Sequence, residues 1–386
     1  MVEVLIFLLL IVVAVLGIFF VAIYKKNIHI WLIDYIARKV EPPVRGEPIH
    51  IMFAFVDHYE PGWGNPTYEK EVERVDEWCD RYPQLARNHK DADGYLPKHT
   101  FFFPEEEYRE EHLEKLCKLC SNGFGEIEIH LHHDNDTADG LKGKITGFLE
   151  TLDQKHGAIP RDKETTDFRF AFIHGNWALD NSRRDGRWCG VNNELAVLAD
   201  LGCYADFTLP SAPSDTQTSK VNSIYYAKGE NGKSKSHNYG IDVEVGRPAS
   251  GDLMIIQGPL CLNWKQRKFG IFPRIENSDI RENSPPSQQR VDMWIKCGIQ
   301  VKKQPQWRFV KIHTHGTQDH DMDTVLGKSV DEMFGYLESN YNDGQNYILH
   351  YVSAREMYNI IVAAESGETG DAGQYRDFKI PKPVYL

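Results

Sequence analysis

Histidines and acidic residues gather in four short segments of the chain, and each segment lies at the end of an apolar run. They are Asp57 and His58; then His130, His132, His133, Asp134 and Asp136; then His174; and finally His313 and His315. Imidazole and carboxylate groups are ligands that a borderline metal such as zinc accepts, and the same groups move protons in catalysis. The pattern favours metal-dependent chemistry.

The densest group lies in the segment GEIEIHLHHDND, residues 125–136. In an extended strand, alternate side chains point to opposite faces, so Glu126, Glu128, His130 and His132 share one face and the intervening apolar residues share the other. We expect the apolar face to contact helices and the polar face to line the interior. A solvated, histidine-rich turn is the alternative reading.

The other segments offer complementary groups. In FAFVDHYEP, Asp57 and His58 stand where a strand opens into a loop, and can supply a general base and a metal ligand; the alternative is a capping Asp and a surface His. In IHGNW, His174, Asn176 and Trp177 offer polar groups and an aromatic face suited to a sugar ring, although a buried structural Trp is as common. In FVKIHTHG, His313 or His315 can act as a general acid.

Parallel strands alternating with crossover helices would bring these segments together. Candidate strands are 49–56, 98–103, 126–132, 168–174, 205–209, 253–257, 308–313 and 347–351, with helical patterns between most of them. This rhythm predicts an α/β fold, a (β/α) barrel that is complete or distorted, with seven or eight strands. Active residues of such barrels collect at the carboxyl ends of the strands, where all four segments lie.

Around this barrel, predicted for residues 49–365, we expect further segments. Residues 4–24 form an uncharged apolar run, from which we predict a transmembrane anchor over 1–24 and a single-pass membrane protein. Residues 25–48 are an amphipathic juxtamembrane segment and linker, 214–248 an inserted hairpin or loop, and 366–386 a tail. The basic flank after residue 24 predicts a cytoplasmic catalytic domain, whereas enzymes acting on exported glycans work outside, so sidedness stays open.

Composition excludes some functions. The chain has 386 residues and a formal net charge of −12, which argues against a nucleic acid partner because binding to phosphates needs a basic surface. Seven cysteines, an odd and widely spaced set, exclude a complete disulfide framework. The CxxC at Cys117 and Cys120 lies in a helical pattern without a second CxxC, and predicts two small buried residues rather than a metal site.

The chain resembles the polysaccharide deacetylase superfamily, carbohydrate esterase family four and its relatives, over about residues 49–360. The resemblance rests on VDH at 56–58, KHTFFFP at 98–104, EIHLHHDND at 128–136 and VKIHTH at 310–315, in the family's order. It implies Asp57 as the base and His313, or its competitor His315, as the acid. It implies His58, His132 and Asp136 as metal ligands, with His130 as a substitute for Asp136.

The resemblance also implies a divalent metal, most simply Zn2+, and a polysaccharide or amino-sugar glycan from which N-acetyl or O-acetyl groups are removed. Two departures from the family pattern are His58 in place of an aspartate and Asp136 in place of a histidine. The open alternatives are another metal-dependent amidohydrolase or phosphoesterase barrel, a glycosidase with two carboxylates, and an inactive glycan-binding or scaffold subunit of a polysaccharide assembly system.

Overall fold

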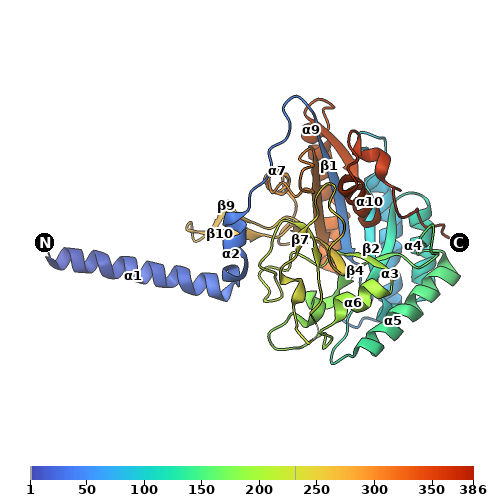
Figure 1. Ribbon diagram of the computed structural model, residues 1–386, viewed down its shortest axis with the longest axis horizontal. Helices are drawn as coiled ribbons and strands as arrows, with labels where there is room; N and C mark the ends of the chain where they lie inside the picture. The colour runs from blue at the N-terminus through green and yellow to red at the C-terminus, as the bar shows by residue number, and fades with distance from the viewer. Residues whose placement is uncertain (1, 231) are drawn as a thin grey trace.

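The computed structural model describes the backbone of every residue except Met1 and Asn231, and the side chains of residues 2, 3 and 11–16 are also outside the description. A large sheet stands at the centre, with helices around it (Figure 1). The strands are β1 (Ile49–His58), β2 (His99–Pro104), β3 (Gly125–Leu131), β4 (Phe170–His174), β5 (Cys203–Asp206), β6 (Ile224–Ala227), β7 (Ile241–Asp242), β8 (Leu253–Ile256), β9 (Cys261–Lys268), β10 (Phe272–Glu276), β11 (Asp279–Ile280), β12 (Trp307–Thr314) and β13 (Tyr347–Tyr351).

All eight strands predicted from the sequence are present, each within a few residues of its expected bounds. The helices are α1 (Val2–Lys25), α2 (Ile28–Ala37), α3 (Tyr68–Ala86), α4 (Glu110–Ser121), α5 (Ala138–Thr151), α6 (Glu194–Asp200), α7 (Gln288–Lys296), α8 (Asp319–Val325), α9 (Lys328–Tyr341) and α10 (Ala354–Glu365). Cys117 and Cys120 are buried on α4, where they pack into the main apolar core.

The central sheet runs in the order β11-β12-β1-β2-β3-β4-β5-β8-β6-β7, and β13 also pairs with β1. From β11 to β8 every neighbouring pair is parallel, while β6 is antiparallel to both β8 and β7. Strand β13 pairs with residues 49–53 of β1, and β2 pairs with residues 55–58 of the same strand. The carboxyl ends of the parallel strands therefore meet at one edge, as the sequence predicts.

The predicted barrel is only partly confirmed, because the strand pairing among the described residues does not close into a ring. The order of pairing gives the physical reason. The inserted segment supplies β6 and β7, and β6 occupies the edge of β8 that a closing strand would need. Closure is approached just beyond β8, where a Cβ added to Gly258 would lie 2.4 Å from the main-chain oxygen of Lys311 on β12.

The sheet separates two apolar layers. On β1, Ile51, Phe53 and Phe55 pack into the core that includes the surrounding helices, whereas Met52, Ala54 and Val56 pack into a second core. That second core contains most of α10, whose side chains are buried on nearly every side. Because even its polar side chains, such as Arg355 and Asn359, are buried, α10 is enclosed and fills the interior of the curved sheet.

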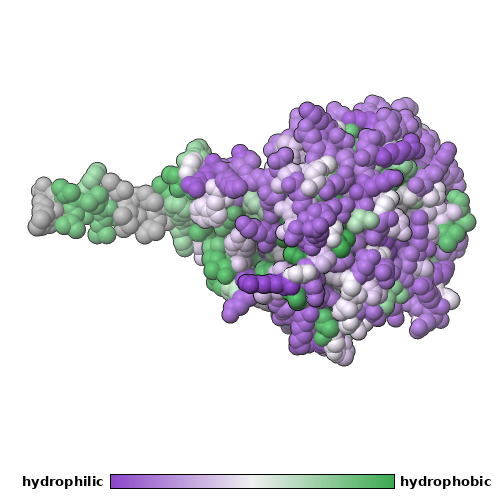
Figure 2. All heavy atoms as spheres, turned by 90° about the horizontal axis from the view of Figure 1, so that it is seen from above, coloured by the Kyte–Doolittle hydropathy of each residue, from purple (hydrophilic) through white to green (hydrophobic). Residues whose placement is uncertain are grey.

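The N-terminal part corrects a prediction. Over the residues that the structure describes, no helix is long and apolar enough to cross a membrane. The prediction of a single-pass membrane protein anchored by residues 4–24 is therefore wrong on this finding, and six of those residues, 11–16, have no described side chains. Helix α1 extends away from the rest of the protein, and its described side chains form an apolar column (Figures 1 and 2). The amphipathic α2 lies on the domain and buries Trp31 against Ala212, Val221 and Leu260.

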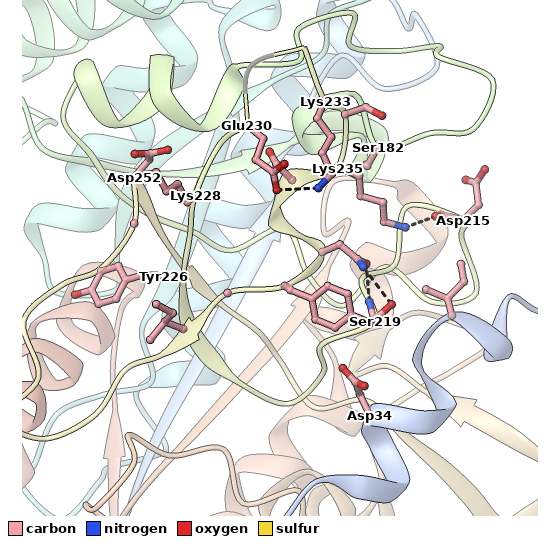
Figure 3. Close-up of a pocket in the computed structure, with 18 of the residues that line it drawn as sticks. Asp34, Ser182, Asp215, Ser219, Tyr226, Lys228, Glu230, Lys233, Lys235 and Asp252 are labelled. Carbon is pink, nitrogen blue, oxygen red and sulfur yellow. Dashed lines mark hydrogen bonds and ion pairs between the residues drawn. The ribbon is translucent and has the colours of Figure 1, made fainter.

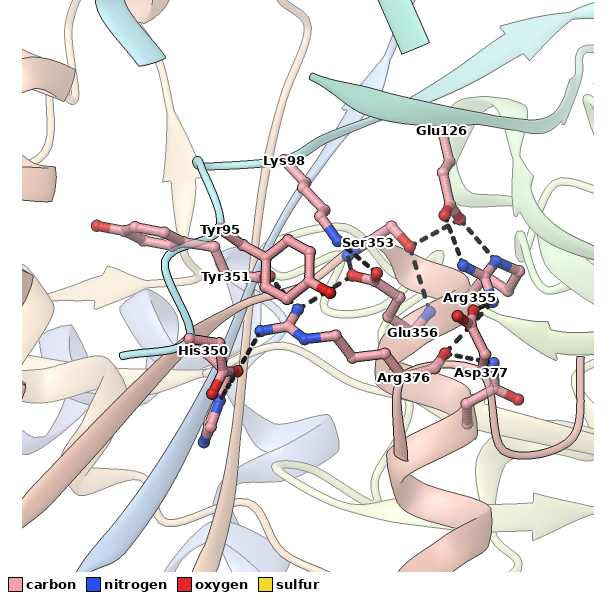
Figure 4. A network of polar contacts seen from close by, with 12 residues as sticks. Tyr95, Lys98, Glu126, His350, Tyr351, Ser353, Arg355, Glu356, Arg376 and Asp377 are labelled. Atoms are coloured by element: carbon pink, nitrogen blue, oxygen red, sulfur yellow. Dashed lines mark hydrogen bonds and ion pairs between the residues drawn. The ribbon is translucent and has the colours of Figure 1, made fainter. Parts of the chain in front are cut away.

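The C-terminal segment is held by buried ion pairs around the start of α10 (Figure 4). Arg355 donates to both carboxylate oxygens of Glu126 on β3, at 2.7 and 2.9 Å, and to Asp377 at 2.6 Å. Arg376 donates to Asp91 at 2.8 Å. Residues 366–386 are thus joined to the interior of the sheet through a bidentate Arg–carboxylate pair, a geometry that fixes both partners.

We predict that Arg355→Met lowers the free energy of unfolding by about 3–5 kcal/mol, because it leaves the buried carboxylate of Glu126 without its cation. Urea denaturation followed by far-ultraviolet circular dichroism measures the change. Adding Glu126→Leu to the same chain should recover most of the loss, since no buried charge remains. Arg247→Met, which breaks a half-exposed pair with Glu244, is the matched control and should change stability little. Equal effects of the two Arg variants would contradict this.

Candidate metal centre

Five ligand-type side chains from different strand ends converge inside the carboxyl edge of the sheet. They are His58, Glu60, His130, His132 and His315, called here the central cluster. His58 ends β1 on the same face as Met52, Ala54 and Val56, and Glu60 follows two residues later. His315 comes just after β12. All but His132 are nearly or fully buried.

Strand β3 confirms the predicted alternation. Ile127, Ile129 and Leu131 pack into the outer core, while Glu126, Glu128 and His130 point inward. The polar face thus forms a ladder from the buried ion pair at one end of the strand to the histidines at the other. His132 extends this ladder beyond the strand.

Glu60 is the centre of the cluster. Its Oε1 lies 3.1 Å from Nε2 of His130 and 3.3 Å from Nε2 of His132. On the other side, the rings of His58 and His315 stack with centroids 4.4 Å apart, and their ligand atoms and one carboxylate oxygen of Glu60 lie within 4.8 Å of one another. One carboxylate is therefore shared by four imidazoles.

The outer nitrogens of these rings are held by partners that leave the inner ones free. His130 donates from Nδ1 to the carbonyl oxygen of Ile173 at 2.7 Å, and His132 donates from Nδ1 to Glu106 at 2.5 Å. Nε2 of each ring is thus directed at Glu60, and it offers a lone pair to a metal once its proton is displaced, the arrangement that metal-binding histidines adopt. His315 differs, because its Nδ1 accepts from Arg281 at 3.1 Å and Nε2 must carry the hydrogen.

The charges in the cluster are strongly coupled. Burial would raise the pKa of the Glu60 carboxyl, but hydrogen bonds from His130 and His132 hold it well below its usual range. Burial would lower the pKa of His132, yet Glu106 and Glu60 raise it to about 10. Burial lowers the pKa of His315 to about 4, and burial with the neighbouring imidazoles lowers that of His58 well below 6.5. An anionic Glu60 beside neutral His58 and His315 results.

The donor set fits a divalent metal. Two imidazole nitrogens and one carboxylate oxygen, from His130, His132 and Glu60, supply the three protein ligands of a catalytic zinc site, which keeps a further position open. His58 lies on the opposite side of Glu60 and can complete such a site, while the Nε2 hydrogen of His315 can be donated to a group bound there. Several buried clusters of this kind in the described residues could bind a metal.

Asp57 is not brought to the central cluster. It points to the outer face of β1, where Oδ2 accepts from His99 Nε2 at 3.0 Å and Oδ1 accepts from the backbone N–H of Gly316 at 2.7 Å. Trp78 donates from its indole to the carbonyl oxygen of Gly316 at 2.9 Å. These bonds hold the turn that follows His315, so the geometry favours a positioning role for Asp57 over that of a base.

Some of the predicted acid and substrate-binding residues lie beside the central cluster, and others do not. His313 points inward on β12, with its ring centroid 6.5 Å from that of His58 and its Nε2 3.8 Å from Asp279. The ring of Trp177 lies 6.1 Å from His58 and 5.8 Å from His315, so this side chain forms a wall of the cluster. Asn176 lies beside it in a turn in which both residues have positive φ.

His174 and Asp136 lie elsewhere. His174 ends β4 on the outer face, where its Nε2 is 2.8 Å from Nε2 of His133. Asp136 accepts from Nδ1 of His133 at 2.8 Å and from Lys144 at 2.7 Å. Both predicted residues therefore belong to a second group of side chains next to the central cluster.

Sequence reasoning missed three acidic residues near the cluster, Glu60, Glu106 and Glu107. Glu60 stands two residues beyond His58 in the same DHYE segment, so period-two spacing could have identified it. Glu106 and Glu107 follow the end of β2, a strand tip like the others. Burial raises the pKa of the Glu107 carboxyl to about 7, and its Oε2 accepts from the backbone N–H of Gly62 at 2.6 Å.

A cavity of about 1130 Å³ lies away from these histidines, between α2 and the inserted segment (Figure 3). Its wall contains apolar side chains and the charged residues Asp34, Lys228, Glu230, Lys233 and Asp252. None of the central-cluster residues lines it. The inserted segment thus shapes a hollow of its own, and the histidines lie beside a different part of the surface.

Comparison with known proteins adds little. No protein-family model and no curated protein matches the sequence. Among solved structures, one neighbour is provisionally named a polysaccharide deacetylase from Mycobacterium smegmatis, with 13% identity and a TM-score of 0.42 over 85% of this chain and 96% of that one. Another is a 4-alpha-glucanotransferase from Thermococcus litoralis, with 10% identity and a TM-score of 0.38 over 79% of this chain and 40% of that one. Both scores are too low to carry an argument.

We predict that Asp57→Ala destabilises the protein by about 1–3 kcal/mol, because it leaves the buried N–H of Gly316 without an acceptor. Asp57→Asn keeps an oxygen for that bond, and should retain bound metal and most hydrolytic activity. Thermal unfolding, metal content and activity of the two variants measure this. A fully folded, metal-loaded Asp57→Asn protein without turnover would restore Asp57 as the base.

Proposed function

We propose that the protein is a metal-dependent hydrolase of the polysaccharide deacetylase type, which removes acetyl groups from a polysaccharide or amino-sugar glycan. The observation that carries the proposal is the convergence of His58, His130, His132 and His315 on the single carboxylate of Glu60. The order of the sequence motifs supports the same class.

Glu60, His130 and His132 are the proposed ligands, with His58 adjoining Glu60 on the other side. A divalent ion of the zinc class supplies, when bound, Lewis acidity toward water and toward a carbonyl oxygen. Ile173 and Glu106 keep the two ligand imidazoles in the tautomer that presents Nε2. This set replaces Asp136, which supports His133 instead.

Glu107 is the proposed proton acceptor. Its carboxyl has a pKa of about 7, near the value at which a group both accepts and releases a proton at neutral pH. It would take a proton from the attacking water and pass it to the leaving amine or alkoxide. Asp57 is less suited, because its two oxygens are already bonded to His99 and Gly316.

His315 and Trp177 are proposed to orient the substrate. Arg281 donates to Nδ1 of His315, so the hydrogen on Nε2 is available to a carbonyl oxygen. The aromatic face of Trp177, beside His58 and His315, suits a sugar ring. A planar apolar face beside a row of polar groups favours a glycan over a lipid or a nucleic acid substrate.

We predict that His130→Ala loses the metal of the central cluster and hydrolytic activity together. Loss of an outer partner alone weakens metal binding about 10–100-fold, and loss of a ligand should cost more. Metal content of the purified full chain and acetate release from N- and O-acetylated glycans measure the two effects. His320→Ala, at a half-exposed histidine on α8, is the matched control and should change neither.

The outcomes distinguish the alternatives. Full metal content in His130→Ala would refute the ligand assignment. A different metal hydrolase would be favoured if His130→Ala loses the metal and the wild type releases no acetate from any acetylated glycan. In that case, the wild type should hydrolyse other amides or phosphoesters. Glycan binding without any hydrolysis would favour an inactive binding subunit.

We predict a second effect, on pH dependence. Glu107 must be ionised to accept a proton, and burial raises its pKa to about 7, so activity should fall as the pH is lowered through about 7. Glu107→Gln should lower kcat by about 10²–10⁴ and remove this acidic limb while metal content stays unchanged. Glu105→Gln, in the same short helical turn, should keep the limb. A limb that persists in Glu107→Gln would assign the base elsewhere.

A further inference from the structure

A second group of potential ligands lies on the outer side of the β3 and β4 ends. It consists of His133, His174, Cys189 and Glu194, called here the outer cluster. His133 follows β3, His174 ends β4, Cys189 lies in the next loop and Glu194 begins α6. All four are buried, and His174, Cys189 and Glu194 have no exposed surface.

Two of the distances between the ligand atoms are those expected around one metal ion. Oε1 of Glu194 lies 3.3 Å from Nε2 of His133 and 3.4 Å from Nε2 of His174. Ligands about 2.0–2.1 Å from a tetrahedral zinc lie roughly 3.3 Å apart, so these two distances match an edge of such a site. Sγ of Cys189 is 3.3 Å from the other oxygen of Glu194.

Hydrogen bonds from Nδ1 orient the imidazoles of His133 and His174. His133 donates from Nδ1 to Asp136 at 2.8 Å, and His174 donates from Nδ1 to the carbonyl oxygen of Gly175 at 2.6 Å. The neutral rings then carry lone pairs on the two Nε2 atoms, which face each other at 2.8 Å. Two acceptors at this distance repel each other unless a proton or a metal ion lies between them.

The carboxylate of Glu194 and the thiol of Cys189 are the other two potential ligands. Oε1 of Glu194 is buried without a hydrogen-bond partner among the described residues, whereas Oε2 accepts from the backbone of Asp180 at 2.5 Å. Sγ of Cys189 accepts from the backbone N–H groups of Asn181 at 3.2 Å and Val191 at 3.4 Å. Without a metal, the thiol donates to Oε2 of Glu194 at 3.3 Å. Once a metal displaces that proton, the two backbone donors would stabilise the thiolate, which is the form that binds metal.

We propose that the outer cluster is a second metal site, which binds a divalent ion of the zinc class through two imidazoles, one thiolate and one carboxylate. Four protein ligands without solvent access are typical of a structural site, in contrast to the three ligands and open position expected of the central cluster. The competing explanation is a proton shared between His133 and His174, with no metal.

The position of this site gives it a role in the fold. It joins the ends of β3 and β4 to the start of α6. His133 adjoins His132 of the central cluster, and His174 lies three residues before Trp177, which forms a wall of that cluster. Metal at the outer cluster would therefore fix the two loops that shape the central one. The inference does not rest on the proposed function, because its ligands and its test are separate.

Cobalt substitution tests the proposal on the full-length wild type. The central cluster contains no sulfur ligand, so a thiolate-to-cobalt charge-transfer band in the near ultraviolet reports the outer cluster alone. We expect this band in the Co2+-loaded wild type, its loss in Cys189→Ser, and its retention in Cys203→Ser, a matched variant at another buried thiol. His130→Ala should keep the band even where the central metal is lost.

Metal content and stability give a second measurement. His133→Ala/His174→Ala should hold one equivalent of zinc fewer than the wild type, and chelation should lower the Tm of the wild type. Absence of the cobalt band from the folded wild type, or an unchanged band in Cys189→Ser, would overturn the proposal. The wild-type spectrum decides the matter even if the variants do not fold. Loss of hydrolytic activity in His130→Ala with the band intact would concern only the proposed function.

Discussion

The burial of charge inside a curved sheet is the constraint on which the rest of the structure depends. A buried carboxylate is costly unless a cation or several donors reach it. Along the inner face of β3 this requirement is met three times: Glu126 pairs with Arg355, Glu128 accepts from Tyr204 and from a backbone amide, and His130 faces Glu60. Each partner comes from a distant segment, so satisfying these charges also assembles the fold.

The polar inner face of β3 has a stabilising ion pair at one end and the candidate metal ligands at the other. At the start of β3 a bidentate ion pair joins the strand to α10, which fills the interior of the curved sheet. At the other end Glu60 is surrounded by imidazoles, an arrangement that uses its negative charge to hold a cation. The inserted β6 strand occupies the edge of β8 and keeps the sheet open, while polar contacts between its segment and Asp180 cover the outer cluster.

The two proposed metal sites differ in the number of protein ligands and in their access to substrate. A site with four buried protein ligands has no position for substrate, and its binding energy contributes to folding. The central cluster has three proposed protein ligands, one of which, His132, is partly exposed, so it can offer a position to substrate. His132 belongs to the central cluster and His133 to the outer cluster. These two adjacent residues lie in different sites because successive side chains of an extended segment point to opposite faces of the sheet.

The sequence alone determined the strands and the inner face of β3, because the alternation in GEIEIHLH assigns each side chain to a face. It could not do so for β1, where residues on both sides of the strand are apolar and period two gives no signal. Only the tertiary structure decided that His58 points inward and Asp57 outward. It also decided the outer cluster, since Cys189 and Glu194 lie in a loop and a helix start whose positions depend on packing, and local sequence carries no information about contacts made across the fold.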